Sequence, residues 1–266
     1  LPEQGVHTTF DFHGRAPKAV KSDIWESLIE REAEDGWGFI LSGRENEFGY
    51  GSISTPRTLA TLDTILNLYG TRPLKELIQP AIEYCRNGVL IRPHMSSYWN
   101  MPATAGRDPN ISMVNKFKET QKIYCDESGL VKRVGDLLLN PDMGQLYQDI
   151  GDYGVNHFYS GEISQRITSD MQKNGGLLAL EDLQECMPEE NPPLWGTFFD
   201  YKIATNNPPG GGVMLVEMLN ILEEFDLKNM GHNSVEYIKV VSEVMKIATI
   251  DKDTKVGDPK FTVVPT

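Results

Sequence analysis

Long apolar runs are missing from this sequence. It has no stretch of about 18 consecutive apolar residues, the length that a membrane-spanning helix needs, so we predict no membrane span. The first residues, LPEQGVHTTFDFHG, also lack a charged region followed by an apolar core, and no signal peptide is visible. A mature or trimmed chain would lack one too, so the localisation stays open between periplasmic or extracellular and cytoplasmic.

Positive charge is also scarce. The chain has 25 Lys and Arg against 38 Asp and Glu, a net charge of −13. Binding to nucleic acid depends on Lys and Arg that neutralise phosphates, and binding to an anionic membrane surface depends on basic clusters. The charge therefore argues against both partners, and a small-molecule or peptide substrate fits the chain better.

Cysteine and histidine occur in patterns that exclude several kinds of site. The three cysteines, Cys85, Cys125 and Cys186, are far apart and form no CxxC, which argues against a disulfide framework. We expect each to be a small buried hydrophobic residue rather than a nucleophile. The five histidines form no HxH or HExxH pattern, so the sequence gives no support for a metal site.

Helical periodicity dominates the rest of the chain. At 266 residues with 39% apolar residues, the chain can bury a substantial core in one or two domains. Apolar spacing predicts helices over 21–35, 55–70, 74–88, 145–150, 152–158, 162–172, 180–183, 213–225 and 234–250. Between them we expect a Gly-rich loop over 36–54 and a long loop or helical insert over 92–134.

Strands, by contrast, are few. Only 6–12 and 196–205 have the β-branched and aromatic pattern of a strand. Helices this apolar need a surface to pack on, and two strands provide little sheet. We therefore predict that another polypeptide supplies partner strands.

Residues 191–226 form the most informative stretch. The predicted strand 196–205 is followed by Asn-Asn-Pro-Pro at 206–209, which stops it, then by three glycines at 210–212 and the apolar helix 213–225. Glycines before a helix can hold a phosphate, but the Lys and Ser/Thr of a nucleotide-binding loop are missing here. Close packing of strand against helix is the preferred explanation of the glycines.

The Pro-Pro, Gly-Gly-Gly and Leu-Asn-x-Leu-Glu order in this stretch resembles the gamma-glutamyltransferase family of N-terminal-nucleophile amidohydrolases. FDFHGRAP at 10–17 looks like that family's D-x-R-E-x-A-P motif. Further similar segments follow in family order at 69–74, 80–82, 140–142, 158–161, 174–183 and 257–261. Together these segments cover most of the chain.

The resemblance implies an α+β fold, a four-layer αββα sandwich to which this chain contributes mainly helices and part of the sheets. Residues 1–266 would form a single domain, the large-subunit portion of a two-chain hydrolase, with the family's N-terminal segment missing. The family matures by cutting itself before a threonine, which becomes the nucleophile at the start of the small subunit. Thr266 ends this chain, so no catalytic residue is expected within it. The expected partner is the small subunit from the same precursor, and no cofactor is implied.

One motif departs from the family. The family's Arg, which binds the α-carboxylate of the glutamyl group, is His13 here, its Glu is Gly14, and Arg15 stands two positions further on. In an extended backbone, the side chains of residues 13 and 15 point to the same side. The predicted substrate-binding residues are therefore Arg15 and His13, although a neutral imidazole holds a carboxylate less well than a guanidinium does. The alternative is that Arg15 is a surface residue and His13 a polar residue at a strand end.

Three functions remain open from the sequence. The leading one is the large subunit of an enzyme that cleaves or transfers gamma-glutamyl or related amide groups, as in glutathione metabolism. The second is an amidase or acylase of the same family that acts on another small amide. The third is a catalytically inactive relative that serves as a binding or scaffold protein.

Overall fold

The structure is a computed structural model that describes residues 3, 5–36 and 38–266; Trp37, within the predicted Gly-rich loop, lies outside them. The chain separates into two compact units. Unit 1 comprises Leu1–Phe12 with Pro188–Thr266, and unit 2 comprises His13–Met187. Helices and short antiparallel strand pairs occur in both, so the α+β class is confirmed. The expectation of a single domain over 1–266 stays a prediction.

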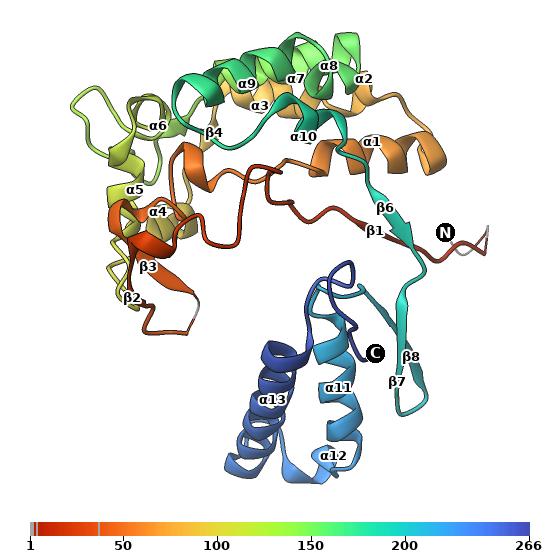
Figure 1. The fold of residues 1–266 in the computed structure, drawn as a ribbon. Helices are drawn as coiled ribbons and strands as arrows, with labels where there is room; N and C mark the ends of the chain where they lie inside the picture. Colours follow the sequence, from red (N-terminus) through yellow and green to blue (C-terminus); the bar gives the residue numbers. More distant parts are fainter. Residues whose placement is uncertain (1–2, 4, 37) are drawn as a thin grey trace. The chain divides into compact units, whose positions relative to one another are not determined.

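Unit 2 is mainly helical (Figure 1). Its helices are α1 (Thr58–Tyr69), α2 (Leu74–Leu77), α3 (Gln79–Asn87), α4 (Pro93–Trp99), α5 (Asn110–Lys116), α6 (Lys118–Tyr124), α7 (Pro141–Tyr153), α8 (Asn156–Tyr159), α9 (Glu162–Lys173) and α10 (Leu180–Gln184). Its strands form two antiparallel pairs, β2 (Ile29–Glu32) with β3 (Phe39–Leu41) and β4 (Val89–Leu90) with β5 (Leu137–Leu138). Short 3-10 turns lie at Glu26–Leu28, Ser42–Arg44 and Tyr50–Ser52. The stretch 92–134 is thus a helical insert, one of its two predicted forms.

The core of unit 2 lies among α7, α8, α9 and α10. Its buried residues are Ile150, Val155, Tyr159, Ile163, Met171, Leu178, Leu183 and Cys186. Helix α7 continues through Gly151, where the sequence suggested a break. A Cβ on Gly151 would lie 3.3 Å from Ile78 Cγ2, and one on Gly144 would lie 3.2 Å from Cys85 Cβ. Both glycines therefore serve close helix packing instead of ending a helix.

The predicted helix over 21–35 is wrong. The chain forms a 3-10 turn and then β2, which pairs with β3 as a hairpin. Gly36 and Gly38 take positive φ angles of 71° and 82°, and the Ala33 N–H bonds to the Gly38 carbonyl at 2.8 Å. A turn that needs left-handed glycines ends any helix, so the turn chemistry outweighs the weak helical spacing.

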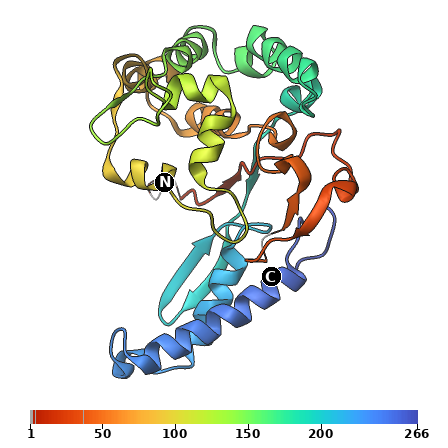
Figure 2. The ribbon, with the colours of Figure 1, turned by 90° about the vertical axis from the view of Figure 1, so that its left-hand side faces the viewer.

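Unit 1 contains two strand pairs and three helices among its described residues. β1 (Thr9–Asp11) pairs with β6 (Glu189–Asn191), and β7 (Leu194–Phe198) pairs with β8 (Tyr201–Thr205). The helices are α11 (Gly212–Glu223), α12 (Leu227–Met230) and α13 (Val235–Lys255). Helices α11 and α13 lie side by side, and the β7–β8 hairpin lies beside α11 (Figures 1 and 2). Ser234 caps α13, as the sequence indicated, by accepting a bond from the Tyr237 N–H at 3.1 Å.

The stretch predicted as one strand, 196–205, is a hairpin. It turns at Phe199 and Asp200, and Phe199 has a positive φ of 49°. The Phe199 N–H bonds to Glu223 Oε1 at 2.7 Å, so the last residue of α11 holds the turn. The alternating pattern gave the strands correctly but not the turn between them, because the turn contains no Gly, Asn or Pro.

Packing explains Gly210 and Gly212 of the glycine run, as predicted, whereas a Cβ on Gly211 would meet nothing within 4 Å. A Cβ on Gly212 would lie 2.1 Å from the Asn206 carbonyl oxygen, a distance that no side chain tolerates. A Cβ on Gly196 of β7 would lie 2.6 Å from Val216 Cγ1 of α11. Strand and helix therefore approach each other at the glycines. No helix among the described residues is long and apolar enough to cross a bilayer.

Candidate functional site

The predicted site residues lie on an exposed segment at the start of unit 2. His13 and Arg15 are both exposed, and Pro17 behind them is buried. Arg15 forms an antiparallel bridge with Thr55, whose N–H bonds to the Arg15 carbonyl at 2.8 Å. The bridge shows that the backbone at Arg15 is paired as in a strand, in keeping with the extended backbone assumed above. The structure thus places both side chains on one backbone-anchored segment, and their role in substrate binding stays a prediction.

A buried arginine holds the beginning of this segment. Arg57 is 2% exposed. Its Nη1 donates to the His13 carbonyl at 3.3 Å and its Nη2 donates to the Met187 carbonyl at 2.6 Å. One guanidinium thus bridges the first and the last residue of unit 2.

A buried carboxylate holds the other end of the segment. Asp182, 7% exposed, accepts from the Lys18 N–H and from the Ala179 N–H, both at 2.9 Å. The Lys18 ammonium pairs with Glu185, and this hydrogen bond raises the pKa of Lys18. From His13 to Lys18 the backbone is therefore anchored at three points while its polar side chains face outward.

Two core side chains fix the element that carries Arg57. The Tyr159 hydroxyl donates to the Pro56 carbonyl at 2.9 Å and accepts from the Ala60 N–H at 3.0 Å. The Cys186 Sγ donates to the same carbonyl at 3.3 Å. Burial raises the pKa of Tyr159 to about 12 and also raises the pKa of Cys186, so both groups stay protonated donors at neutral pH.

This arrangement corrects one prediction and supports another. Helix α1 begins at Thr58 with Arg57 as its N-cap, not at Pro56, because the Pro56 carbonyl is bonded to side chains of the core. Cys125 and Cys186 are buried, as predicted for small hydrophobic residues, and Cys85 is partly buried. Burial raises the pKa of Cys125 too, which makes a thiolate nucleophile unfavourable there.

The departure at position 14 has a structural counterpart. A Cβ on Gly14 would lie 2.5 Å from Ser54 Oγ and 3.2 Å from Ser54 Cβ. The Ser54 side chain thus occupies the space that any larger residue at position 14 would need. Gly14 and Ser54 fit each other, so a glutamate could not replace Gly14 here without a shift of Ser54.

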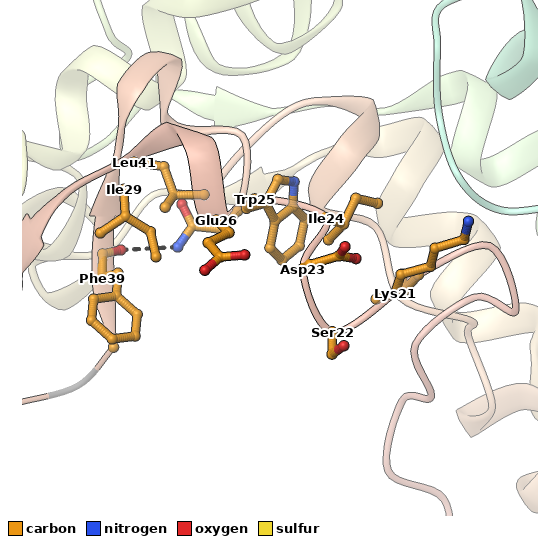
Figure 3. Close-up of a pocket in the computed structure, with 12 residues that line it drawn as sticks. Lys21, Ser22, Asp23, Ile24, Trp25, Glu26, Ile29, Phe39 and Leu41 are labelled. Carbon is orange, nitrogen blue, oxygen red and sulfur yellow. Dashed lines mark hydrogen bonds between the residues drawn. The ribbon is translucent and has the colours of Figure 1, made fainter.

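A pocket of ≈ 620 Å³ lies within unit 2, between the stretch after this segment and the β2–β3 hairpin (Figure 3). Ile24 and Trp25 line it from one side, and Ile29, Phe39 and Leu41 line it from the hairpin. The described residues that line it include no His or Cys, so they offer no Ser–His or Cys–His pair. Its mainly apolar wall suits binding of an apolar group more than bond cleavage.

No group of three or more His, Cys, Asp or Glu side chains among the described residues could hold a metal ion. Arg57 and Asp182 bond to backbone atoms, and Lys18 pairs with Glu185.

Two residues that contact the segment, Arg57 and Ser54, were not predicted from the sequence. A signal for Arg57 was available, because a cation at a helix N-terminus opposes the helix dipole and is unusual there. A basic residue at the start of the predicted helix therefore indicates a contact made outside the helix. For Ser54 no sequence signal existed, since its fit to Gly14 depends on the bridge between two distant segments.

The structure belongs to a known fold class. The crystal structure of Helicobacter pylori gamma-glutamyltranspeptidase matches with a TM-score of 0.85 and 28% identity, over 98% of this chain and 70% of that chain. The fold is therefore that of the N-terminal-nucleophile hydrolases.

The family follows from the sequence match. The family described as Gamma-glutamyltranspeptidase matches residues 2–266, and the chain belongs to that family. The Glutathione hydrolase proenzyme of Escherichia coli (strain K12) is 30% identical over 99% of this chain and 43% of its own length. The Acylase ACY 1 proenzyme of Pseudomonas sp. (strain V22) is 29% identical over 98% of this chain and 45% of its own length. The chain thus spans less than half the length of these curated relatives.

Proposed function

We propose that this chain is the large-subunit part of an amidohydrolase that cleaves, and can transfer, gamma-glutamyl or related amide groups. The observation that carries the proposal is the family match over residues 2–266 together with the anchored segment at 13–18. This segment stands where the family's carboxylate-binding motif stands. The chain's own task would be to bind and orient the substrate, while a companion chain supplies the nucleophile.

The chemistry would follow the family. A threonine hydroxyl is a weak nucleophile, and the free amine of the same N-terminal residue takes its proton. The oxygen attacks the amide carbonyl, the C–N bond breaks, and the leaving amine takes up the proton, which leaves an acyl-enzyme. Water then completes hydrolysis, or an acceptor amine completes transfer. Donors of an oxyanion hole stabilise the tetrahedral intermediates.

The companion chain would cover unit 1. Apolar side chains along α13 are exposed, with Val235 at 86%, Ile250 at 63% and Met245 at 53%. The β7–β8 pair has no third strand among the described residues, so its edges can accept further strands. The relatives are named proenzymes, which agrees with two chains cut from one precursor. With this companion, we expect residues 1–266 to behave as one domain.

Two substrate classes remain candidates, and different features of the site support each of them. Arg15, with help from His13, would hold a substrate carboxylate, which favours gamma-glutamyl compounds. His13 and Gly14 in place of the family's Arg and Glu favour the second candidate, an amidase or acylase for another small amide. The close approach of Ser54 to Gly14 supports the second candidate, because the family's Glu would not fit at position 14 without a shift of Ser54.

The proposal is tested by expressing the complete gene product and identifying the chains into which it is processed. Intact mass and N-terminal sequencing of all chains that co-purify under denaturing conditions should reveal a second polypeptide that begins with Thr. The purified pair should then hydrolyse a gamma-glutamyl anilide or a small uncharged amide. A complete product that stays uncut and shows no amide hydrolysis would favour the scaffold alternative.

The carboxylate contact has its own test. Arg15→Ala should raise KM for the gamma-glutamyl anilide by about 10- to 100-fold, the range expected for one charge-assisted hydrogen-bonded contact. KM for an uncharged anilide should change little. Lys18→Ala is the matched control, since it removes a cation of the same segment that pairs with Glu185. Equal effects of Arg15→Ala on both substrates would count against the contact.

A further inference from the structure

Arg57 contacts the backbone of the proposed substrate-binding segment. Its two terminal nitrogens donate to the carbonyls of His13 and Met187, at 3.3 and 2.6 Å. These residues are far apart in the sequence, and both belong to unit 2. The guanidinium therefore fixes the position of the His13 carbonyl, where the segment begins.

The geometry requires an arginine. A guanidinium is planar and directs several N–H groups outward in a rigid fork, so one side chain can reach two carbonyls. A lysine ammonium is a compact charge on a flexible stem and does not reproduce that fork. A buried charge also needs strong polar partners, and carbonyl oxygens provide them here.

Arg57 is itself held in place from the core of unit 2. Its carbonyl accepts from Thr61 Oγ1 at 3.1 Å, and Thr61 is 1% exposed. The preceding Pro56 carbonyl accepts from Tyr159 and Cys186, as described above. A continuous series of contacts thus runs from the core through Arg57 to the backbone of His13. The adjacent Thr55 extends it to Arg15 through the bridge at 2.8 Å.

We propose that Arg57 is a positioning residue for substrate specificity: it sets the backbone of the 13–15 segment so that Arg15 and His13 meet a substrate carboxylate. The inference rests on the proposed function and adds to it a residue that acts through the segment without touching the substrate. It explains why a cation stands, buried, at the start of α1.

The test compares two equivalent arginine substitutions in the processed two-chain enzyme. Arg57→Lys keeps the charge but loses the fork. Arg44→Lys is the control, because the Arg44 side chain is 12% exposed, pairs with Glu47 at 2.8 Å and donates to the Gly106 carbonyl at 3.5 Å, away from residues 13–15. For each variant, KM and kcat are measured with a gamma-glutamyl anilide and with an uncharged anilide, on enzyme normalised by active-site titration.

Arg57→Lys should raise KM for the gamma-glutamyl anilide about tenfold or more relative to the uncharged anilide, since a small misplacement of a binding group can cost about 100-fold. The kcat of the titrated enzyme should change little, and Arg44→Lys should leave the ratio of the two KM values as in the wild type. Parallel losses with both substrates, or an unchanged ratio in Arg57→Lys, would overturn the proposal.

A second readout does not depend on activity. The Thr55 N–H bonds to the Arg15 carbonyl, so hydrogen exchange of the peptide that contains Thr55 reports whether the segment stays in place. Arg57→Lys should speed this exchange, whereas the Ile91 N–H, bonded to the Asp136 carbonyl at 2.9 Å, should keep its rate. Unchanged exchange at Thr55 would refute positioning by Arg57. Faster exchange with no substrate preference in the wild type or in Arg15→Ala would refute the carboxylate contact of the proposed function instead.

If Arg57→Lys does not fold, Tyr159→Phe provides the same test in a milder form. It removes the hydroxyl that holds the Pro56 carbonyl and leaves the ring in the core. The expected KM change has the same direction and is smaller. A Tyr159→Phe enzyme with wild-type KM values and wild-type exchange at Thr55 would contradict the proposed series of contacts.

Discussion

Units 1 and 2 differ in where their apolar side chains lie. In unit 2, eight buried side chains form one cluster that spans α7 to α10. In the described part of unit 1, the buried side chains of the hydrophobic core are Val244 and Ala248 of α13. Meanwhile Val235, Ile250 and Phe261 of unit 1 are 86%, 63% and 88% exposed.

The difference shows that apolar helices in a unit do not by themselves guarantee that the unit buries its own core. Unit 2 buries a cluster of apolar residues against its own helices, so it carries a core, although other apolar side chains such as Leu62 and Met187 remain exposed. Unit 1 pairs two helices with a two-stranded hairpin, and one face of each element stays uncovered. Exposed apolar surface of this kind marks an interaction site, which agrees with the proposed companion chain.

The largest expected effect separates the two units by core truncation. Leu183→Ala in unit 2 removes a fully buried side chain, at 0% exposure, from the centre of the cluster. It should lower the free energy of unfolding by about 2–5 kcal/mol, because a cavity remains where the side chain was. Chemical denaturation of the chain without its companion measures the change.

Val235→Ala is the matched truncation in unit 1. Val235 is 86% exposed, so the same measurement should give a change within about 0.5 kcal/mol. If both substitutions lower the free energy of unfolding equally, the claim that unit 2 is packed and unit 1 is uncovered would be wrong.

The sequence could predict those parts of the fold that local signals determine. Helices α11 and α13 and the end of β8 before Asn206 were predictable, because long apolar periodicity, Pro-Pro and a Ser cap are local signals. The β2–β3 hairpin was not, since its four exposed β2 residues carry no alternation to distinguish it from a helix. The β7–β8 turn was missed because a side chain of α11 stabilises it.

The candidate site was predictable only in part, for a related reason. The resemblance located His13 and Arg15, but the contacts that fix their backbone come from Arg57 and Thr55, which are distant in sequence. Such contacts depend on tertiary structure, and a single sequence contains no periodic signal for them.

A smaller effect on stability tests the close packing of the chain at Gly212 in unit 1. Gly212→Ala places a Cβ 2.1 Å from the Asn206 carbonyl oxygen, so the start of α11 must shift. We expect a loss of about 1–3 kcal/mol, as for other overpacked sites. Gly211→Ala is the control next to it, since a Cβ there meets nothing within 4 Å and its φ is −74°. Denaturation that does not distinguish the two variants would contradict the close strand-to-helix packing.

The smallest effect concerns a pair of carboxyl groups between α11 and α13 in unit 1. Burial, together with a hydrogen bond to Asp251, raises the pKa of Glu217 above its ordinary value of 4.5. The bond from Lys255 to Asp251, at 2.7 Å, and the bond with Glu217 lower the pKa of Asp251 below 3.8. Glu217 thus stabilises the fold below pH 4.5, and this contribution is lost as the pH rises through its raised pKa. Asp251 contributes above pH 3.8 and loses its contribution as the pH falls.

Glu217→Gln isolates the Glu217 contribution, because the amide keeps the shape and a donor for Asp251 but cannot ionise. At pH 4.5 the Tm of the variant should be close to that of the wild type. At pH 7 the variant should have the higher Tm, because Glu217 of the wild type is then ionised and has lost its stabilising contribution. Glu224→Gln, at the exposed end of α11, is the control and should show no such gain. The measurement is the Tm of the wild type, Glu217→Gln and Glu224→Gln at pH 4.5 and at pH 7. A Glu217→Gln gain that stays constant with pH would mean that ionisation of this pair does not affect how α11 packs on α13, and that the weakness of unit 1 lies in its uncovered apolar faces alone.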